Sequence, residues 1–402
     1  MKGQLRLARR AIVCLFFSVG ASYGILTSRI PALCAQINGS ESIVGAAMLC
    51  LGIGSLAGFA SISVLLKFWR QKNILRVTTF LLYLFLPLTG LSWDGISFCA
   101  SFLLFGTVFA LSDVALNMQG LLLEHRLRHH CLAGLHASYS MGGVSGAALG
   151  AMTAALELTS LLSFCCFGAV FVMGWTMVSG NLLAETSGQG GTVNERDASE
   201  GRIPAMVVLF GILALMAFTV EGACGEWSAL LLHTEKGASE SLAALGFGAF
   251  SISMCVGRLF GDRLRRSWGD FRLLLASTLA ALIGQVIVIF APWPLLCLCG
   301  YALAGLGMAP IAPLILSRGG NRTDISPQRA ATIISIMGYA GLLVVPPSIG
   351  WLAESFGLSM ALLLPLSFTL ILMLSSFLFR KREGDAPCIR KRCGIPGYGS
   401  DR

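Results

Sequence analysis

The chain has 402 residues, of which 55% are apolar and only 12% are charged, against about 25% charged residues in soluble domains. A net charge of +9 would favour nucleic-acid binding in a soluble protein. Here all but two of the 29 Lys and Arg residues lie in, or at the edge of, every second gap between long apolar stretches. This placement puts the cations beside lipid headgroups and indicates that nucleic acid is not a partner. Little polar sequence is left for a catalytic domain, so we do not expect an enzyme.

The apolar stretches are each long enough to cross a membrane as a helix, since about 20 apolar residues span about 30 Å of hydrocarbon. In chain order they are 11–31, 42–66, 74–93, 95–122, 134–156, 160–184, 204–232, 241–261, 271–291, 293–317, 329–352 and 357–379. The two cations outside the basic gaps are Arg29 and Lys236. The positive-inside rule therefore places both termini in the cytoplasm. We predict an all-α membrane protein with twelve transmembrane helices.

The spans fall into two sets of six. The stretch 185–203 is rich in Gly, Ser and charged residues, which is typical of a mobile linker, here a cytoplasmic one. It separates an N-terminal six-helix bundle (1–184) from a C-terminal one (204–380), and a basic cytoplasmic tail (381–402) follows. Two such halves, with a solute site between them, are typical of secondary transporters.

Arg29 is the cation near the outer end of the first span. Its guanidinium can pair with an anionic solute or with an acid such as Glu221. The alternative is that its long side chain extends to the lipid headgroups.

The fourth span carries an acid within the membrane. Asp113 and Asn117 are four residues apart, so they share one helix face, with Glu124 at the cytoplasmic end. A carboxylate inside a span costs several kcal/mol and usually marks an ion or solute pathway. Burial disfavours its charged form, so we expect Asp113 to exchange protons near neutral pH. The alternative is a structural hydrogen bond to a neighbouring helix.

The fifth span begins with a titratable residue. His136 precedes Ser140 by four residues at the predicted cytoplasmic mouth. An imidazole changes charge near neutral pH and can relay protons. A hydrogen bond to the loop after the fourth span explains the same residue equally well.

The seventh span holds Glu221 near its outer end, followed by Gly222, Gly225 and Trp227. Glycines beside a buried acid favour a break in the helix, which would expose backbone groups to a solute. An outer-gate or substrate role for Glu221 and a helix end in interfacial water both remain open. For Glu226 we expect an interfacial position.

The loop after the eighth span reads Gly257-Arg258-Leu259-Phe260-Gly261-Asp262-Arg263. Glycines allow close helix packing, and an Asp at a cytoplasmic helix end can accept hydrogen bonds from a facing helix N-terminus. We predict that Gly257, Arg258, Gly261, Asp262 and Arg263 form a gating loop. The alternative is that the cations merely fix the topology.

This loop resembles the signature loop of the major facilitator superfamily. The runs 113–120, 136–143, 221–228 and 338–341 resemble the YbjJ-like bacterial inner-membrane transporters, which are similar to sugar permeases of the fucose-permease type. The resemblance implies proton coupling at the acid that precedes Asn117 by four residues. It also implies a sugar- or polyol-like solute, and Tyr23, Tyr139, Trp227 and Tyr339 are aromatic residues able to stack on a sugar ring.

We therefore predict a secondary active transporter that moves a small polar solute across the bacterial inner membrane by alternating access, coupled to protons. The alternatives are a drug or metabolite exporter of the same fold and a non-transporting receptor or scaffold. No nucleotide-binding loop is present, and the cluster of His125, His129 and His130 is too small for a di-iron site. We expect no cofactor, no metal site and a monomer in contact with membrane lipids.

Overall fold

The computed structural model describes residues 2–127, 131–184, 203–320 and 327–380. The predicted linker and tail lie almost entirely outside these ranges. Within them, every regular element is a helix and no strand occurs. The long apolar stretches of the sequence satisfy their backbone hydrogen bonds internally in this way, as a membrane requires.

The described residues of the N-terminal half form seven α-helices and one short 3-10 helix. They are α1 (Lys2–Ser28), α2 (Ile30–Gln36), α3 (Glu41–Phe68), α4 (Gln71–Gly90), α5 (Gly95–Leu127), α6 (Leu132–Ala155), α7 (Ser160–Val178) and η1 (Ser179–Asn181). The C-terminal half contains α8 (Ala205–Glu226), α9 (Ser228–Thr234), α10 (Glu240–Phe290), α11 (Pro294–Met308), α12 (Ile311–Gly320), α13 (Pro327–Phe356), α14 (Leu358–Ala361) and α15 (Leu363–Arg380).

Eleven helical stretches of the described chain are long and apolar enough to cross a membrane. The predicted fifth span corresponds to α6, which is not among the eleven. This helix is rich in Gly, Ala and Ser and packs against α1 and α10. Small residues allow such close helix packing but contribute little hydropathy. The number of twelve spans and the cytoplasmic position of the termini therefore stay predictions.

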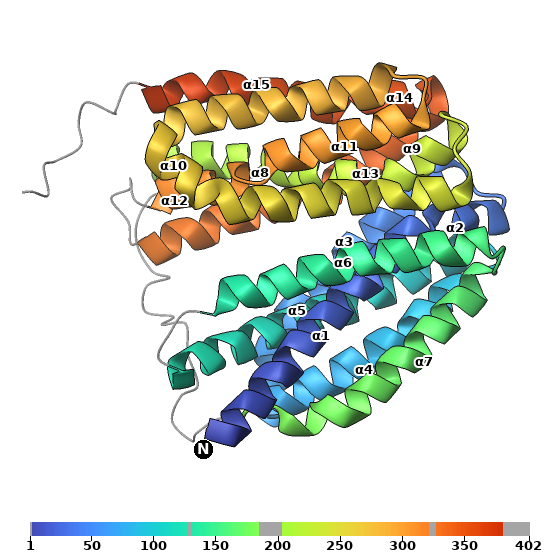
Figure 1. The fold of residues 1–402 in the computed structure, drawn as a ribbon, viewed down its shortest axis with the longest axis vertical. Helices are drawn as coiled ribbons and strands as arrows, with labels where there is room; N and C mark the ends of the chain where they lie inside the picture. Colours follow the sequence, from blue (N-terminus) through green and yellow to red (C-terminus); the bar gives the residue numbers. More distant parts are fainter. Residues whose placement is uncertain (1, 128–130, 185–202, 321–326, 381–402) are drawn as a thin grey trace, which may run out of the picture.

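Several predicted spans are interrupted at identifiable residues. The first is divided at Arg29, where Pro31 begins a new helical turn and the ring of a proline suits that first turn. The predicted eighth and ninth spans lie almost entirely within α10, which turns back on itself at Gly269, where φ is 75° (Figure 1). This left-handed backbone geometry favours glycine.

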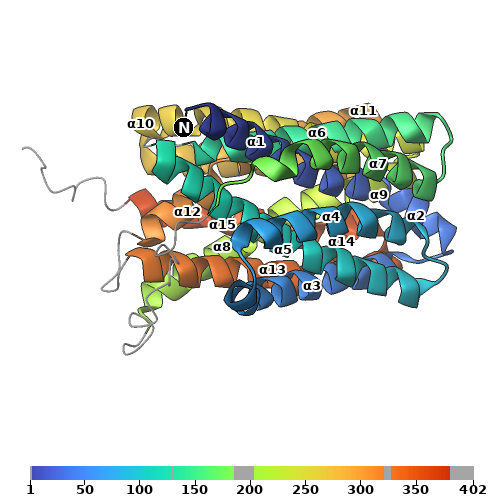
Figure 2. The same cartoon turned by 90° about the horizontal axis from the view of Figure 1, so that it is seen from below.

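The two halves lie side by side (Figures 1 and 2). Across their interface, α6 packs on α10 and α3 packs on α13. The helices α3 and α13 approach each other closely at Gly45 and Gly350, where a Cβ added to Gly350 would lie 3.0 Å from the Cα of Gly45. Glycine at both positions lets the two backbones meet at one end of the interface.

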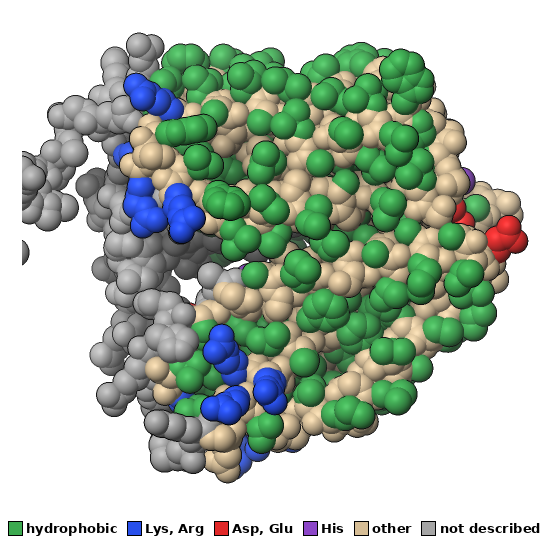
Figure 3. Space-filling view, in the orientation of Figure 1, with side chains coloured by type: hydrophobic (Ala, Val, Ile, Leu, Met, Phe, Trp, Pro, Cys, Tyr) green, Lys and Arg blue, Asp and Glu red, His purple; other side chains and the backbone are tan. Residues whose placement is uncertain are grey.

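The two ends of the molecule differ in charge and in closure. The start of α1 and the end of α15 lie at the same end (Figure 1). Lys and Arg side chains gather at this end, and a hollow separates the two halves there (Figure 3). We call this the basic end, and the opposite end the outer end.

Candidate functional site

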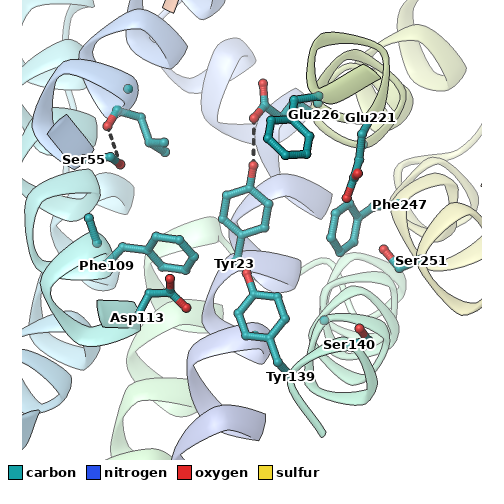
Figure 4. Close-up of a pocket in the computed structure, with 18 of the residues that line it drawn as sticks. Tyr23, Ser55, Phe109, Asp113, Tyr139, Ser140, Glu221, Glu226, Phe247 and Ser251 are labelled. Atoms are coloured by element: carbon teal, nitrogen blue, oxygen red, sulfur yellow. Dashed lines mark hydrogen bonds between the residues drawn. The ribbon is translucent and has the colours of Figure 1, made fainter. Parts of the chain in front are cut away.

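A cavity of about 440 Å³ lies between the two halves, a volume within the usual range for small-molecule sites. The N-terminal half lines it with residues of α1, α3, α5 and α6, and the C-terminal half with residues of α8, α10 and α13. Figure 4 shows its acidic and aromatic side chains pointing toward one another from both halves. The cavity therefore lies where the two-half plan predicted a solute site.

Asp113 of α5 lines this cavity and is half-buried. Its backbone carbonyl accepts a hydrogen bond from the Asn117 side chain at 2.9 Å. Within the described part of the chain, no Lys, Arg or His forms an ion pair with the Asp113 carboxylate. An acid without a cation in this position can exchange a proton or pair with a charged solute.

Glu221 of α8 also lines the cavity, and Arg258 of α10 pairs with it at 3.2 Å. Both side chains are partly exposed, at 32% and 43%. Arg258 thus lies in the cavity itself rather than only in the loop after the eighth span. Its single contact with Glu221 leaves guanidinium donors for a solute.

The predicted break in the helix beside Glu221 is wrong. The helix α8 continues through Gly222 and Gly225 to Glu226, and the interruption comes at Trp227. Both glycines line the cavity, and a Cβ added to Gly225 would lie 3.4 Å from the Phe247 ring. These glycines make room for the cavity and for Phe247 instead of ending the helix.

The helix α6 contributes His136, Tyr139 and Ser140 to the cavity. The His136 imidazole makes a T-shaped contact with the Phe16 ring, with 5.4 Å between ring centroids and 70° between the ring planes. The alternative partner of His136, the loop after the fourth span, includes residues 128–130 and lies outside the described residues. His136 therefore remains a candidate for proton relay.

Glycines bring α6 and α1 close together beside the cavity. A Cβ added to Gly20 would overlap the carbonyl oxygen of Tyr139, and one added to Gly142 would overlap that of Phe17. The backbones therefore touch at these points. This close approach places Tyr139 beside Tyr23, as Figure 4 shows.

Glu226 does not lie at the membrane interface, so that expectation is wrong. Its side chain is only 8% exposed and lines the cavity. The Tyr23 hydroxyl donates a hydrogen bond to Glu226 Oε1 at 2.8 Å, drawn as a dashed line in Figure 4. Because α1 belongs to one half and α8 to the other, this hydrogen bond joins the two halves.

Arg29 makes a second contact between the halves, at the outer end. It is 2% exposed, so its side chain does not extend to the lipid headgroups. The guanidinium lies 2.7 Å from Glu240 at the start of α10 and donates a 2.7 Å hydrogen bond to the Leu158 carbonyl. The predicted pairing with an acid therefore holds for Glu240 and not for Glu221, which pairs with Arg258 instead.

Two other predicted site residues, Asn117 and Trp227, are not among the residues that line the cavity. Asn117 lies one turn beyond Asp113, and its amide bonds the α5 backbone. Trp227 is 1% exposed and packs in the core, so it cannot stack on a solute in this conformation. The side chain of Tyr339 lies outside the described part of the structure.

The predicted gating loop is helical through Arg263. Gly257 packs closely on the C-terminal end of α11, where an added Cβ would lie 2.6 Å from that of Ala309, the residue that follows this helix. The side chain of Asp262 lies outside the described part of the structure. Its gating role stays a prediction.

Sequence reasoning missed Asp270, the residue after the Gly269 reversal. Arg265 donates to its Oδ1 at 2.7 Å, and Arg318 of α12 pairs with its Oδ2. The Asp270 side chain is 8% exposed. Asp270 thus links the helical segments before and after Gly269 to α12. Arg318 is too far from Asp270 in the sequence for the pair to be recognised as a motif.

The chain is 30% identical over 347 residues to an uncharacterised MFS-type transporter of Yersinia pestis, covering 86% of this chain and 89% of the relative. The chain belongs to the major facilitator superfamily. It is also 27% identical over 387 residues to membrane protein MosC of Rhizobium meliloti, covering 95% and 92% of the two chains. No family model matches.

Solved major facilitator structures have the same fold. The nucleoside transporter NupG superposes with a TM-score of 0.74 at 10% identity, covering 93% of this chain and 99% of NupG. An inward-facing bacterial homologue of the human lysosomal transporter Spinster gives 0.74 at 12% identity, covering 95% and 98% of the two chains. A D-xylose-proton symporter gives 0.68 at 14% identity, covering 92% and 97%. This protein is a multi-pass membrane transporter and not an enzyme.

Proposed function

We propose that this transporter moves a small polar solute, sugar- or polyol-like, across the bacterial inner membrane by proton-coupled alternating access. The observation that supports this most is the position of Asp113. Its carboxyl faces a cavity between two halves and has no ion-pair partner among the described residues. A proton is the simplest counter-charge for such an acid.

The position of Asp113 supports a role in proton coupling. It belongs to the N-terminal half, while Glu221 and Arg258 face it from the C-terminal half across one cavity. When the halves rock about the cavity, water from either side can reach the carboxyl in turn. Proton uptake on one side and release on the other would then accompany each crossing of the solute.

Contacts at the outer end define the conformation. Tyr23 bonds Glu226, Arg29 pairs with Glu240, and Gly45 meets Gly350. The hollow between the halves is at the basic end (Figure 3), which the positive-inside rule places in the cytoplasm. This arrangement corresponds to an inward-open state, and the outer contacts must separate for the solute to reach the outside.

The resemblance and the cavity wall support the proposed solute class. The sequence resembles sugar permeases, and the wall combines tyrosine rings with the hydroxyls of Ser55, Ser140 and Ser251. Such groups stack on a sugar ring and bond its hydroxyls. The fold alone does not fix the solute.

The test uses purified full-length protein in lipid vesicles. A pH gradient should drive accumulation of at least one labelled sugar, polyol or amino sugar, and a protonophore should abolish it. Accumulation in right-side-out but not inverted vesicles would assign uptake, and the reverse would assign export. Equal movement with and without the pH gradient would contradict proton coupling.

A further inference from the structure

The charged groups of the cavity are unbalanced. Asp113, Glu221 and Glu226 line it, whereas Arg258 is the sole Lys or Arg among its described lining residues. Because Arg258 pairs with Glu221, the other two acids have no cation. His136 is the remaining titratable base on the wall and contacts Phe16.

Glu226 adds an unpartnered acceptor. Its Oε1 accepts the Tyr23 hydrogen bond, but its Oε2 is buried without a partner among the described residues. A buried acceptor without a donor costs free energy. The cavity therefore offers acceptors on both halves and favours a solute that brings donors.

Aromatic rings flank Asp113. Phe109, one turn before it on α5, lies 5.4 Å from the Tyr23 ring, and Phe247 of α10 lies 5.9 Å from Tyr23 on the other side. Figure 4 shows the Asp113 carboxyl beside Phe109, which is the end of this row of rings that belongs to the N-terminal half. The faces of aromatic rings attract cations, and the attraction is stronger where water is excluded.

The described lining residues include no side-chain amide. Among the described lining residues none is Asn or Gln, whose amides both donate to and accept from sugar hydroxyls, so that the serine and tyrosine hydroxyls are the neutral groups of the wall that can do both. Carboxylates only accept. This composition suits an ammonium group, with three donors and a positive charge, better than a neutral sugar alone.

We propose that the solute carries a protonated amine, and that its ammonium group pairs with Asp113 within the row formed by Phe109, Tyr23 and Phe247. The hydroxyl groups of such a solute would face the serines and Arg258. The solute class is therefore a hydroxylated primary amine, and this inference rests on the proposed transport function.

A consequence concerns coupling. The Asp113 carboxylate can hold either a proton or the ammonium group, because either one satisfies its charge. Binding of the amine to the protonated protein must then release one proton. Proton and solute would exclude each other at Asp113, which makes the coupling an exchange.

The experiment compares matched probes on purified full-length protein. Glucosamine, glucose and N-acetylglucosamine share a ring, and only the first carries an ammonium group; galactosamine, galactose and N-acetylgalactosamine form a second set. Binding is measured by titration calorimetry in two buffers of different ionisation enthalpy, which also counts released protons. We expect the amine of at least one set to bind roughly tenfold more tightly than its neutral partners, with release of a proton.

Variants locate the effect. Asp113→Asn should remove the preference for the amine and the proton release. Asp94→Asn, the same substitution at an exposed acid outside the cavity, should leave both unchanged. If Asp113→Asn does not fold, Phe109→Leu is the second variant, because it keeps the Asp113 carboxylate and removes an aromatic ring beside it. Phe109→Leu should weaken amine binding severalfold while proton release persists.

Three results would overturn the inference. The first is binding of the neutral sugars as tight as that of their amines in both sets, and the second is an amine preference that survives Asp113→Asn. The third is absence of amine binding in both sets. Proton flux driven by a neutral sugar in vesicles would keep the proposed function, whereas absence of proton flux with every probe would contradict that function itself.

Discussion

The Tyr23 hydroxyl donates a 2.8 Å hydrogen bond to Glu226, although the two residues are 203 positions apart. Tyr23 belongs to the half of the molecule formed by α1 to α7, and Glu226 to the half formed by α8 to α15. Both residues line the central cavity, and Glu226 is the last residue of α8. The bond therefore connects the contents of the cavity to the closure of the outer end.

Tyr23→Phe should favour the outward-open state. The change removes this hydrogen bond and keeps the ring, and a buried hydrogen bond contributes about 0.5–3 kcal/mol depending on charge. We expect a shift of about tenfold toward outward-open. The measurement is the distance between spin labels at Asp94 and Trp293, both exposed at the outer end, in a background without other cysteines.

Tyr83→Phe is the matched control for this experiment. Tyr83 is buried and bonds Ser18 at 2.5 Å, and both residues belong to the N-terminal half. Loss of the Tyr83 hydroxyl should lower the stability of the protein without changing the distance between the two spin labels. An equal shift in both variants would mean that Tyr23 acts through packing and not through the bond to Glu226.

Arg29→Gln should weaken the contact between the halves at the outer end more than Lys236→Gln does. Arg29 is buried and bridges Glu240 and the Leu158 carbonyl across the halves, so its loss should cost about 1–3 kcal/mol of the closed state. Lys236 donates to the Ile289 carbonyl within the C-terminal half. Lys236→Gln should therefore leave the label distance unchanged, and a comparable opening in both variants would refute a specific role for Arg29.

Gly20→Ala should destabilise the bundle. The new Cβ would overlap the Tyr139 carbonyl oxygen, so α1 and α6 would have to separate at a cost of about 1–3 kcal/mol. Around Gly174 no atom lies within 4 Å of an added Cβ. We expect Gly174→Ala to retain its melting temperature and Gly20→Ala to lose several degrees. Equal melting temperatures would show that the α1–α6 contact is not tight.

Asp270→Asn should slow transport and lower stability by about 1–3 kcal/mol, because two arginines lose a charged partner at a site of low exposure. Asp262→Asn should keep the protein in the membrane yet slow transport, if the predicted gate at that residue is correct. Transport rates and melting temperatures of the two variants separate these roles. Unchanged transport in both would leave the loop with a topological role alone.

Much of this architecture follows from the sequence. Asp113, Glu221, His136 and Tyr139 stand out because polar residues are rare inside apolar spans, and the structure brings these four to one cavity. The basic gaps predict which end carries the cations, and Figure 3 shows them gathered at one end. These features depend on local composition, so no knowledge of packing is needed.

The contacts between the halves could not be predicted in this way. Nothing in the sequence near Arg29 points to Glu240, and nothing near Glu226 points to Tyr23, because each pair forms only when the two bundles pack together. Trp227 is a predicted contact that the structure does not contain. An aromatic residue beside an acid suggests a solute contact, but Trp227 faces the core.

Asp113 carries the central claim, and proton movement in vesicles tests it most directly. Wild-type protein and Asp113→Asn are reconstituted with a pH-sensitive dye inside, and the panel of sugars, polyols and amino sugars is added outside. We predict solute-dependent pH changes with the wild type and none with Asp113→Asn, while both proteins run as folded monodisperse species. Proton movement in Asp113→Asn at the wild-type rate would contradict the account and direct the search for the coupling site to Glu221 or His136.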